Sequence, residues 1–320
     1  MRDSFSRDIE YMRVSITDRC NLRCRYCMPD DLPFIPHSDI LRYEEILRVC
    51  EAAAKVGIRA IKVTGGEPLA RKGCADFLSR LKSVPGVEYV TLTTNGALLE
   101  PYIDRLAVMR LDCVNISLDS LNAETYRRIT GADVFGAVWS SLKKAVESGL
   151  RVKINCVPIK GLNEEDIIPM ARLTETMPVD VRFIELMPTA TCERMERVTG
   201  AEVYSRITVE YPDITPDNAR RGFGPAQYYK SARLKGRIGF ISAIGDCFCP
   251  ACNRVRLTSE GSLKPCLYHN GGLDLRAMLR NGAGDARLES AIADVIYNKP
   301  ERHLFGEGQD GIGAMSRIGG

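Results

Sequence analysis

The chain has 320 residues, of which 45% are hydrophobic and 27% are charged, and its net charge is +3. This composition is typical of a folded globular protein and excludes a disordered chain, and the small net charge gives no indication of a surface for nucleic acid or membrane. The N-terminus lacks the apolar core of a signal peptide and no apolar run reaches bilayer-spanning length, so we expect a cytoplasmic protein.

Six short segments in the first 187 residues are rich in β-branched and apolar residues, and most are followed by a helix-patterned segment. The predicted strands are Met12–Thr17, Arg59–Thr64, Val87–Thr93, Asp112–Leu118, Arg151–Pro158 and Asp180–Leu186. Alternating βα units predict a parallel sheet, and six units are too few for a closed eight-stranded barrel. We therefore predict an α/β fold, an open partial barrel of the TIM type, over residues 1–187. The apolar spacing from Ile46 to Ala54 predicts one of its helices, which ends at Gly57.

One face of these strands is unexpectedly polar. Side chains alternate along a strand, so each of five strands places its polar residues on one side. These residues are Arg13, Ser15 and Thr17; Lys62 and Thr64; Thr91, Thr93 and Asn95; Asn115, Ser117 and Asp119; and Lys153 and Asn155. A packed barrel core would have branched apolar residues there, so the pattern indicates a wet lumen large enough for a ligand. The alternative is that these faces only meet solvent.

The alternation of predicted strands and helices ends after residue 187. We expect residues 188–305 to form a smaller domain that closes the barrel, and residues 306–320, in which six of fifteen positions are glycine, to form a flexible tail.

Twelve cysteines in a cytosolic chain indicate metal binding or catalysis, because disulfides do not persist in a reducing compartment. Five of them stand singly among apolar residues and are expected to be small buried hydrophobes: Cys50, Cys74, Cys113, Cys156 and Cys192. The other seven form two groups.

Cys20, Cys24 and Cys27 form the pattern CxxxCxxC directly after the first predicted strand. Three thiolates on one short loop suit three irons of a cubane cluster and leave the fourth iron open, whereas zinc prefers four ligands from paired CxxC units. Thr64 to Pro68, with the sequence TGGEP, ends the second strand, where glycines allow a ligand to approach the backbone. On its own this segment reads more often as a plain turn.

Together these two motifs resemble the radical S-adenosylmethionine superfamily. The resemblance implies that the methionine part of the cosubstrate binds the open iron, and that reductive cleavage gives a 5'-deoxyadenosyl radical. By position, the cosubstrate contacts are Tyr26, Gly66, Glu67, Ser117 and Met187.

The second cysteine group contains Cys249, Cys252 and Cys266, and Cys247 could complete a four-thiolate zinc site instead. Arg254 and Arg256 follow at once, and two guanidiniums beside a metal suit an anionic ligand. This stretch resembles the auxiliary-cluster motif of the GTP 3',8-cyclases of molybdenum cofactor biosynthesis, and the resemblance extends from Arg13 to the terminal Gly319 and Gly320.

The resemblance implies two 4Fe-4S clusters, one held by Cys20, Cys24 and Cys27 and the other by Cys249, Cys252 and Cys266. It assigns catalytic roles to Arg317, Gly319 and Gly320. It assigns GTP contacts to Arg13, Lys62, Thr93, Lys153, Arg182, Arg254, Val255 and Arg256. Lys62 stands where the family is expected to have arginine, so a bidentate phosphate contact is lost there.

The implied reaction begins with hydrogen abstraction from C3' of GTP, after which the sugar radical attacks C8 of guanine. Expected partners are a reductant such as flavodoxin or ferredoxin and, downstream, cyclic pyranopterin monophosphate synthase; a homodimer is one option for assembly. Two alternatives stay open at this point, a radical peptide-modifying enzyme and a zinc-stabilised binding protein that is not an enzyme.

Overall fold

The structure is a computed structural model that describes residues 1–28, 32–188, 192, 195–242, 244–245, 248–269, 271–303 and 315–319. The chain divides into two compact units. Unit 1 consists of Met1–Asn21, Cys27–Leu92 and Cys249–Gly320, and unit 2 of Leu22–Tyr26 and Thr93–Phe248. Both ends of the chain therefore contribute to unit 1.

The sheet of unit 1 has the strand order β12-β11-β10-β1-β2-β3. Neighbouring β10, β1, β2 and β3 are parallel, whereas β11 and β12 join at the β10 edge as antiparallel strands. The bounds are β1 Tyr11–Ser15, β2 Ala60–Thr64, β3 Tyr89–Thr94, β10 Arg254–Leu257, β11 Ser262–Lys264 and β12 Leu273–Asp274.

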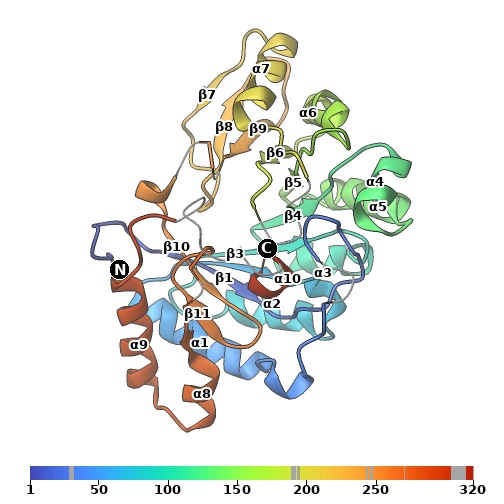
Figure 1. Cartoon of the computed structure of the whole chain (residues 1–320). Coiled ribbons are helices and arrows are strands. Elements are labelled where there is room, and N and C mark those ends of the chain that lie inside the picture. Colours follow the sequence, from blue (N-terminus) through green and yellow to red (C-terminus); the bar gives the residue numbers. More distant parts are fainter. Residues whose placement is uncertain are drawn as a thin grey trace. The chain divides into compact units, whose positions relative to one another are not determined.

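The helices of unit 1 include α1, which packs beside α9 (Figure 1). Arg48 pairs with Asp285 at 2.8 Å and Lys55 with Glu289 at 2.7 Å, which joins the two helices along their surface. The helices are α1 Tyr43–Val56, α2 Cys74–Lys82, α8 Leu275–Arg280, α9 Asp285–Tyr297 and α10 Met315–Ile318, with short 3-10 turns η1 His37–Asp39, η2 Pro68–Ala70 and η5 Cys249–Ala251.

The sheet of unit 2 has the order β4-β5-β6-β9-β8-β7. The strands β4, β5, β6 and β9 are parallel neighbours, and β8 and β7 continue from β9 as antiparallel strands. The bounds are β4 Cys113–Ser117, β5 Val152–Cys156, β6 Asp180–Ile184, β7 Thr215–Asp217, β8 Gln227–Lys230 and β9 Arg237–Ile241.

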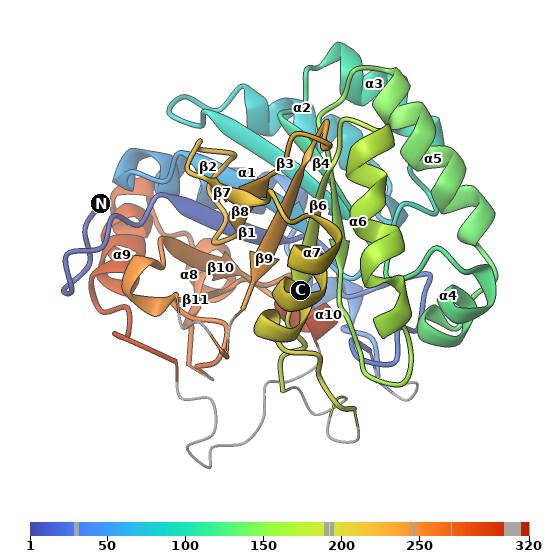
Figure 2. The ribbon, with the colours of Figure 1, turned by 90° about the horizontal axis from the view of Figure 1, so that it is seen from above.

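The helices of unit 2 lie alongside its strands, as the view from above shows (Figure 2): α5 contacts β5 and α6 contacts β6. The helices are α3 Ile103–Val108, α4 Ala123–Thr130, α5 Phe135–Glu147, α6 Ile167–Thr176 and α7 Gly200–Glu210, with 3-10 turns η3 Glu100–Tyr102 and η4 Glu164–Asp166.

The six predicted strands are all present, as β1 to β6, and their bounds differ from prediction by at most two residues at either end. The predicted helix is α1, and Gly57 ends it with a φ of 115°, a left-handed conformation that favours glycine. The alternation along β1 is as predicted, because Met12 and Val14 are fully buried while Arg13 between them is only half-buried.

The five single cysteines are all buried, none more than 5% exposed, so the prediction that they are small hydrophobes of the core is confirmed. Burial raises the pKa of the Cys74 thiol to about 12, which keeps it protonated and inert at neutral pH. Within the residues that the structure describes, no helix is both long and apolar enough to cross a bilayer.

Candidate active site

A row of four cations crosses the sheet of unit 1 at one register level. Lys264 on β11 is opposite Arg256 on β10, Arg256 is opposite Arg13 on β1, and Arg13 is opposite Lys62 on β2. Arg256 is only 6% exposed, and burial followed by the charges of Arg13 and Arg254 lowers its pKa. Like charges side by side on a sheet repel each other, so this row is unfavourable unless an anion offsets its charge.

Val255 lies between two arginines on β10, but its side chain is fully buried on the other face of the strand. A contact from this position to a ligand would have to come from its main chain. Arg254 and Arg256 share the opposite face of β10, where Arg254 is half-buried and Arg256 is buried.

The C-terminal cysteines lie close to this cationic row, because Cys249 and Cys252 directly precede β10 and Cys266 follows β11. Burial opposes ionisation of the Cys252 thiol, but the charges of Arg254 and Lys299 outweigh it and lower the pKa to about 7. Since a thiolate is the form that binds iron, this donor set fits an iron–sulfur cluster. Cys247, the fourth ligand in the zinc alternative, lies outside the described residues.

The N-terminal cysteines are half-buried and unbridged, with Cys20 and Cys27 in unit 1 and Cys24 in unit 2. Around Cys24 the loop is held by main-chain hydrogen bonds from Arg23 and Arg25 to the carbonyls of Thr130 and Ile129, at 2.9 and 3.0 Å. In the part of the chain that is described, no three His, Cys, Asp or Glu side chains form a group that could hold a metal ion. The match to a cluster therefore lies in the donor chemistry and spacing of the cysteines.

The TGGEP segment is packed against the residues that follow β1. The main-chain N–H of Gly66 donates to the Thr17 carbonyl and that of Glu67 to the Arg19 carbonyl, both at 2.7 Å. A Cβ on Gly66 would collide with the carbonyl of Arg19, so only glycine fits there. The fully buried Glu67 carboxylate accepts the Leu69 N–H at 3.0 Å and thereby caps the turn η2.

Tyr26, in the cysteine loop, is anchored within unit 2 by a buried carboxyl group. Its hydroxyl donates to Asp119 Oδ2 at 2.7 Å, and the Val157 N–H donates to Asp119 Oδ1 at 2.8 Å. Burial raises the pKa of Asp119 to about 6 against the effect of these two hydrogen bonds. Ser117, two residues before Asp119, and Met187, shortly after β6, are both half-buried. Sequence reasoning placed Asp119 on the polar face but gave it no role.

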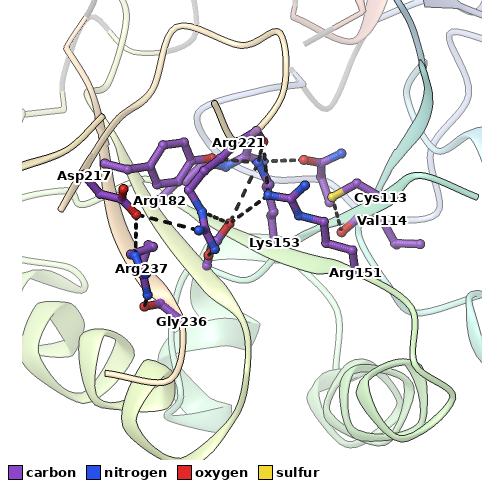
Figure 3. A network of polar contacts seen from close by, with 12 residues as sticks. Cys113, Val114, Arg151, Lys153, Arg182, Asp217, Arg221, Gly236 and Arg237 are labelled. Carbon is purple, nitrogen blue, oxygen red and sulfur yellow. Dashed lines mark hydrogen bonds and ion pairs between the residues drawn. The ribbon is translucent and has the colours of Figure 1, made fainter. Parts of the chain in front are cut away.

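A second basic cluster lies in unit 2 around Lys153 and Arg182 (Figure 3). Lys153 is 4% exposed, and its Nζ donates to the Tyr228 hydroxyl at 2.9 Å and to the Arg221 carbonyl. Burial and the charge of Arg182 lower the pKa of Lys153 to about 7, and Asp180 at 3.9 Å offsets this only in part.

Asp180 is the shared counter-charge of this cluster. It is 3% exposed and pairs with Arg221 at 2.8 Å, in addition to its longer contact with Lys153. Arg221, Tyr228 and Asp180 were not predicted as site residues. Arg221 and Tyr228 lie about seventy residues further along the chain than Lys153, and no local motif marks them.

Three polar atoms near this cluster's strands are buried without a hydrogen-bond partner among the described residues: Thr93 Oγ1, Asn155 Oδ1 and Arg182 Nε. Buried polar groups are almost always paired, so a bound ligand or an ordered water would complete these atoms. Asn155 is opposite both Ser117 and Arg182 in the register of β4, β5 and β6.

The C-terminal segment lies within unit 1. Arg256 Nη1 donates to the Gly319 carbonyl at 3.1 Å. Gly319 has a φ of 71°, and a Cβ added there would lie only 2.6 Å from the Thr64 hydroxyl, so this position favours glycine. Ile318 packs against Tyr268, and Arg317 donates to the Pro33 carbonyl at 2.7 Å. Gly320 lies outside the described residues.

Two family models match this chain and together cover most of it. The model described as Radical SAM superfamily matches residues 14–174, and the model described as Molybdenum Cofactor Synthesis C matches residues 179–305. Among solved structures, SuiB of Streptococcus suis bound to S-adenosylmethionine superposes with a TM-score of 0.67 at 15% identity, over 92% of this chain and 67% of that one. These matches confirm the predicted fold class, an α/β partial barrel of the radical SAM type followed by a C-terminal domain.

Three relatives that match this chain over its full length have the same enzyme name. The GTP 3',8-cyclase of Pelotomaculum thermopropionicum is 43% identical and that of Heliobacterium modesticaldum 44% identical, each over 100% of both chains. The GTP 3',8-cyclase of Moorella thermoacetica is 43% identical over the same share. The chain therefore belongs to the radical SAM superfamily and, within it, to the GTP 3',8-cyclase family.

Proposed function

We propose that this chain is an enzyme that converts GTP to 3',8-cyclo-7,8-dihydro-GTP in molybdenum cofactor biosynthesis. The observation that carries the proposal is the register of Arg256, Arg13 and Lys62, which lines up cations on three neighbouring strands beside the C-terminal cysteines. A triphosphate has the charge that such a row requires, since several cations are needed to neutralise it.

The cofactors of the family are S-adenosylmethionine and two 4Fe-4S clusters, which Cys20, Cys24 and Cys27 and the group Cys249, Cys252 and Cys266 would hold. When bound, they would supply a 5'-deoxyadenosyl radical that takes the hydrogen from C3' of GTP. The sugar radical left on GTP attacks C8 of guanine, and one electron and one proton then complete the dihydro product. The chain's own tasks are to orient the nucleotide, neutralise its charge and exclude water from the radical path.

Each unit carries residues that are proposed as GTP contacts. Within unit 1 these are Arg13, Lys62, Arg254, Arg256 and the main chain of Val255. Within unit 2 they are Thr93, Lys153 and Arg182. The partnerless Nε of Arg182 and hydroxyl of Thr93 support this assignment, because a ligand would satisfy both.

The proposed contacts of the cosubstrate are Tyr26, Gly66, Glu67, Ser117 and Met187. Their support is positional, since Gly66 follows β2, Ser117 ends β4 and Met187 follows β6. In parallel βα folds the carboxyl ends of the strands carry the functional residues. Asp119 holds the Tyr26 ring in place by accepting a hydrogen bond from the Tyr26 hydroxyl.

The terminal residues Arg317, Gly319 and Gly320 are proposed to act in catalysis. The hydrogen bond from Arg256 to the Gly319 carbonyl supports this, because it brings the tail to a cation that is itself a proposed GTP contact.

The remaining expectations also belong to the proposal. They are a cytoplasmic location, a flavodoxin or ferredoxin as reductant, cyclic pyranopterin monophosphate synthase as the next enzyme, and a homodimer as one option for assembly. The proposed functional division is residues 1–187, 188–305 and 306–320, and the two family models, which end at residue 174 and begin at residue 179, support its first boundary.

The nucleotide site is tested by measuring GTP affinity with the reconstituted full chain under anaerobic conditions. Arg13→Ala and Arg254→Ala should each weaken GTP binding roughly ten- to hundredfold, because a charged hydrogen bond contributes about 1.5–3 kcal/mol. S-adenosylmethionine affinity should stay unchanged. Arg48→Ala, which removes an exposed cation of the same unit, is the control. Unchanged GTP affinity in both site variants would show that the cationic row has another purpose.

A further inference from the structure

Lys299 is a buried lysine that follows α9 and lies among the C-terminal cysteines. Its side chain is 2% exposed, and its Nζ donates at 2.5 Å to the carbonyl of Pro265, the residue before Cys266. Burial lowers the pKa of Lys299, while the thiols of Cys252 and Cys266 act in the opposite direction, so the ammonium lies in the electrostatic field of both sulfurs.

A salt-bridged arginine from the N-terminus fixes the segment that carries this lysine. Arg7 is paired with Asp3 at 2.6 Å, and both side chains are almost completely buried. The same guanidinium donates to the carbonyls of Pro300 and Glu301, each at 2.7 Å, and to the carbonyl of Cys249 at 3.0 Å. Residues 299–301 and the first cysteine of the group are therefore tied to one buried side chain.

A hydrogen bond to sulfur completes this arrangement. The main-chain N–H of His303 donates to Cys249 Sγ at 3.4 Å. The segment 299–303 thus contributes both a cation and an N–H donor to the surroundings of the cysteines. Positive charge and hydrogen bonds near the sulfurs are two of the features by which a protein sets the potential of a cluster.

A buried ammonium is unfavourable unless an anion offsets it. Among the described residues no ion pair joins Lys299 to a carboxylate. The groups that favour its charged form are Cys252 and Cys266 as thiolates, whereas the charges of Arg7 and Arg254 act against it. Neither Lys299 nor Arg7 belongs to any motif that the sequence singles out.

We propose that Lys299 is the counter-charge of the C-terminal cysteine site, and that the Asp3–Arg7 pair positions it there. The inference rests on the proposed ligand role of Cys249, Cys252 and Cys266. A cluster held by three thiolates is anionic and becomes more so on reduction, so a fixed cation beside its sulfurs favours the reduced form. Lys299 therefore raises the reduction potential of this cluster and slows its loss of iron.

The test uses the full chain with the three N-terminal cysteines replaced by alanine, so that only the C-terminal cluster contributes to the signal. Lys299→Met, Lys299→Gln and Lys299→Arg are compared in this background by redox titration followed by electron paramagnetic resonance, and by the rate of iron release to a chelator. The Gln variant keeps a donor for the Pro265 carbonyl and provides a second neutral side chain if the Met variant folds poorly. Lys55→Met, which removes an exposed lysine of α1, is the control for total charge.

Both neutral variants should shift the potential to more negative values and release iron several times faster, whereas Lys299→Arg and Lys55→Met should behave like the parent chain. A potential that is unchanged in the Met and Gln variants would overturn the proposal. Cys252→Ala separates this failure from failure of the site itself: a C-terminal cluster that survives that substitution would refute the proposed ligand set, and the lysine's role with it.

Discussion

The low pKa of Lys153 leads to a pH dependence of GTP binding that can be calculated. Burial and the charge of Arg182 lower this pKa to about 7 in the free protein. A bound triphosphate favours the charged form and raises the pKa again, so binding takes up a proton when the lysine is neutral. GTP affinity should then fall as the pH rises through the pKa that Lys153 has in the protein without GTP.

The size of the effect follows from the protonated fraction of Lys153. With a pKa of about 7, that fraction falls from about three quarters at about pH 6.5 to about 3% at about pH 8.5. If the bound form stays protonated over this range, the contribution of Lys153 makes the dissociation constant rise about 25-fold.

The assay is equilibrium binding of GTP at both pH values to the wild-type chain and to Lys153→Arg. Arginine stays charged over this pH range, so the affinity of the Lys153→Arg variant should lack the pH dependence that titration of Lys153 causes. Ionisation of the terminal phosphate of GTP is common to both proteins and cancels when their affinity ratios are compared. An equal change of affinity with pH in the two proteins would refute the assignment of the titrating group to Lys153.

Three further substitutions test other parts of the site. Gly66→Ala should lower the free energy of unfolding by about 1–3 kcal/mol in denaturant, because the added Cβ meets the Arg19 carbonyl. The control Gly136→Ala should be neutral or stabilising, because nothing lies within 4 Å of its added Cβ. Equal effects of the two substitutions would show that the close packing at Gly66 is unimportant. Lys62→Arg should be tolerated and should tighten GTP binding by restoring a bidentate donor, and a large loss of affinity would show that the lysine is fitted to its own surroundings. Removal of Gly319 and Gly320 should leave iron content and most GTP affinity intact but abolish cyclised product, and normal product yield would exclude a catalytic role for the tail.

Much of the fold was predictable because the information is local. The six strands β1 to β6 are apolar and β-branched runs, and period-two alternation alone placed Arg13 and Lys153 on the polar face of their strands. The helix α1 was predictable for the same reason, from its apolar spacing and its glycine cap.

The later strands were harder to predict because their pairing is not local. The strand β9 has arginine and glycine within five residues, and β10 has two arginines within four, so neither shows a clear apolar run. Their place is set by parallel pairing with β6 and β1, which lie far earlier in the sequence.

The same reason accounts for the residues that sequence reasoning missed at the site. Arg7 and the carbonyls it binds are separated by more than 240 residues, and Asp180 gains its importance only because Arg221 and Lys153 converge on it. Cysteine spacing marks a metal site in the sequence, whereas the charges that surround the sulfurs are assembled only by the fold.

The central claim is tested most directly by product analysis. The reconstituted chain is incubated anaerobically with a strong reductant, S-adenosylmethionine and GTP, beside Cys24→Ala and Cys252→Ala variants. The wild-type chain should form 5'-deoxyadenosine and 3',8-cyclo-7,8-dihydro-GTP together. The Cys24→Ala variant should form neither, and the Cys252→Ala variant should retain S-adenosylmethionine cleavage without the cyclised nucleotide. Cleavage of S-adenosylmethionine by the wild-type chain with GTP recovered unchanged would contradict the account.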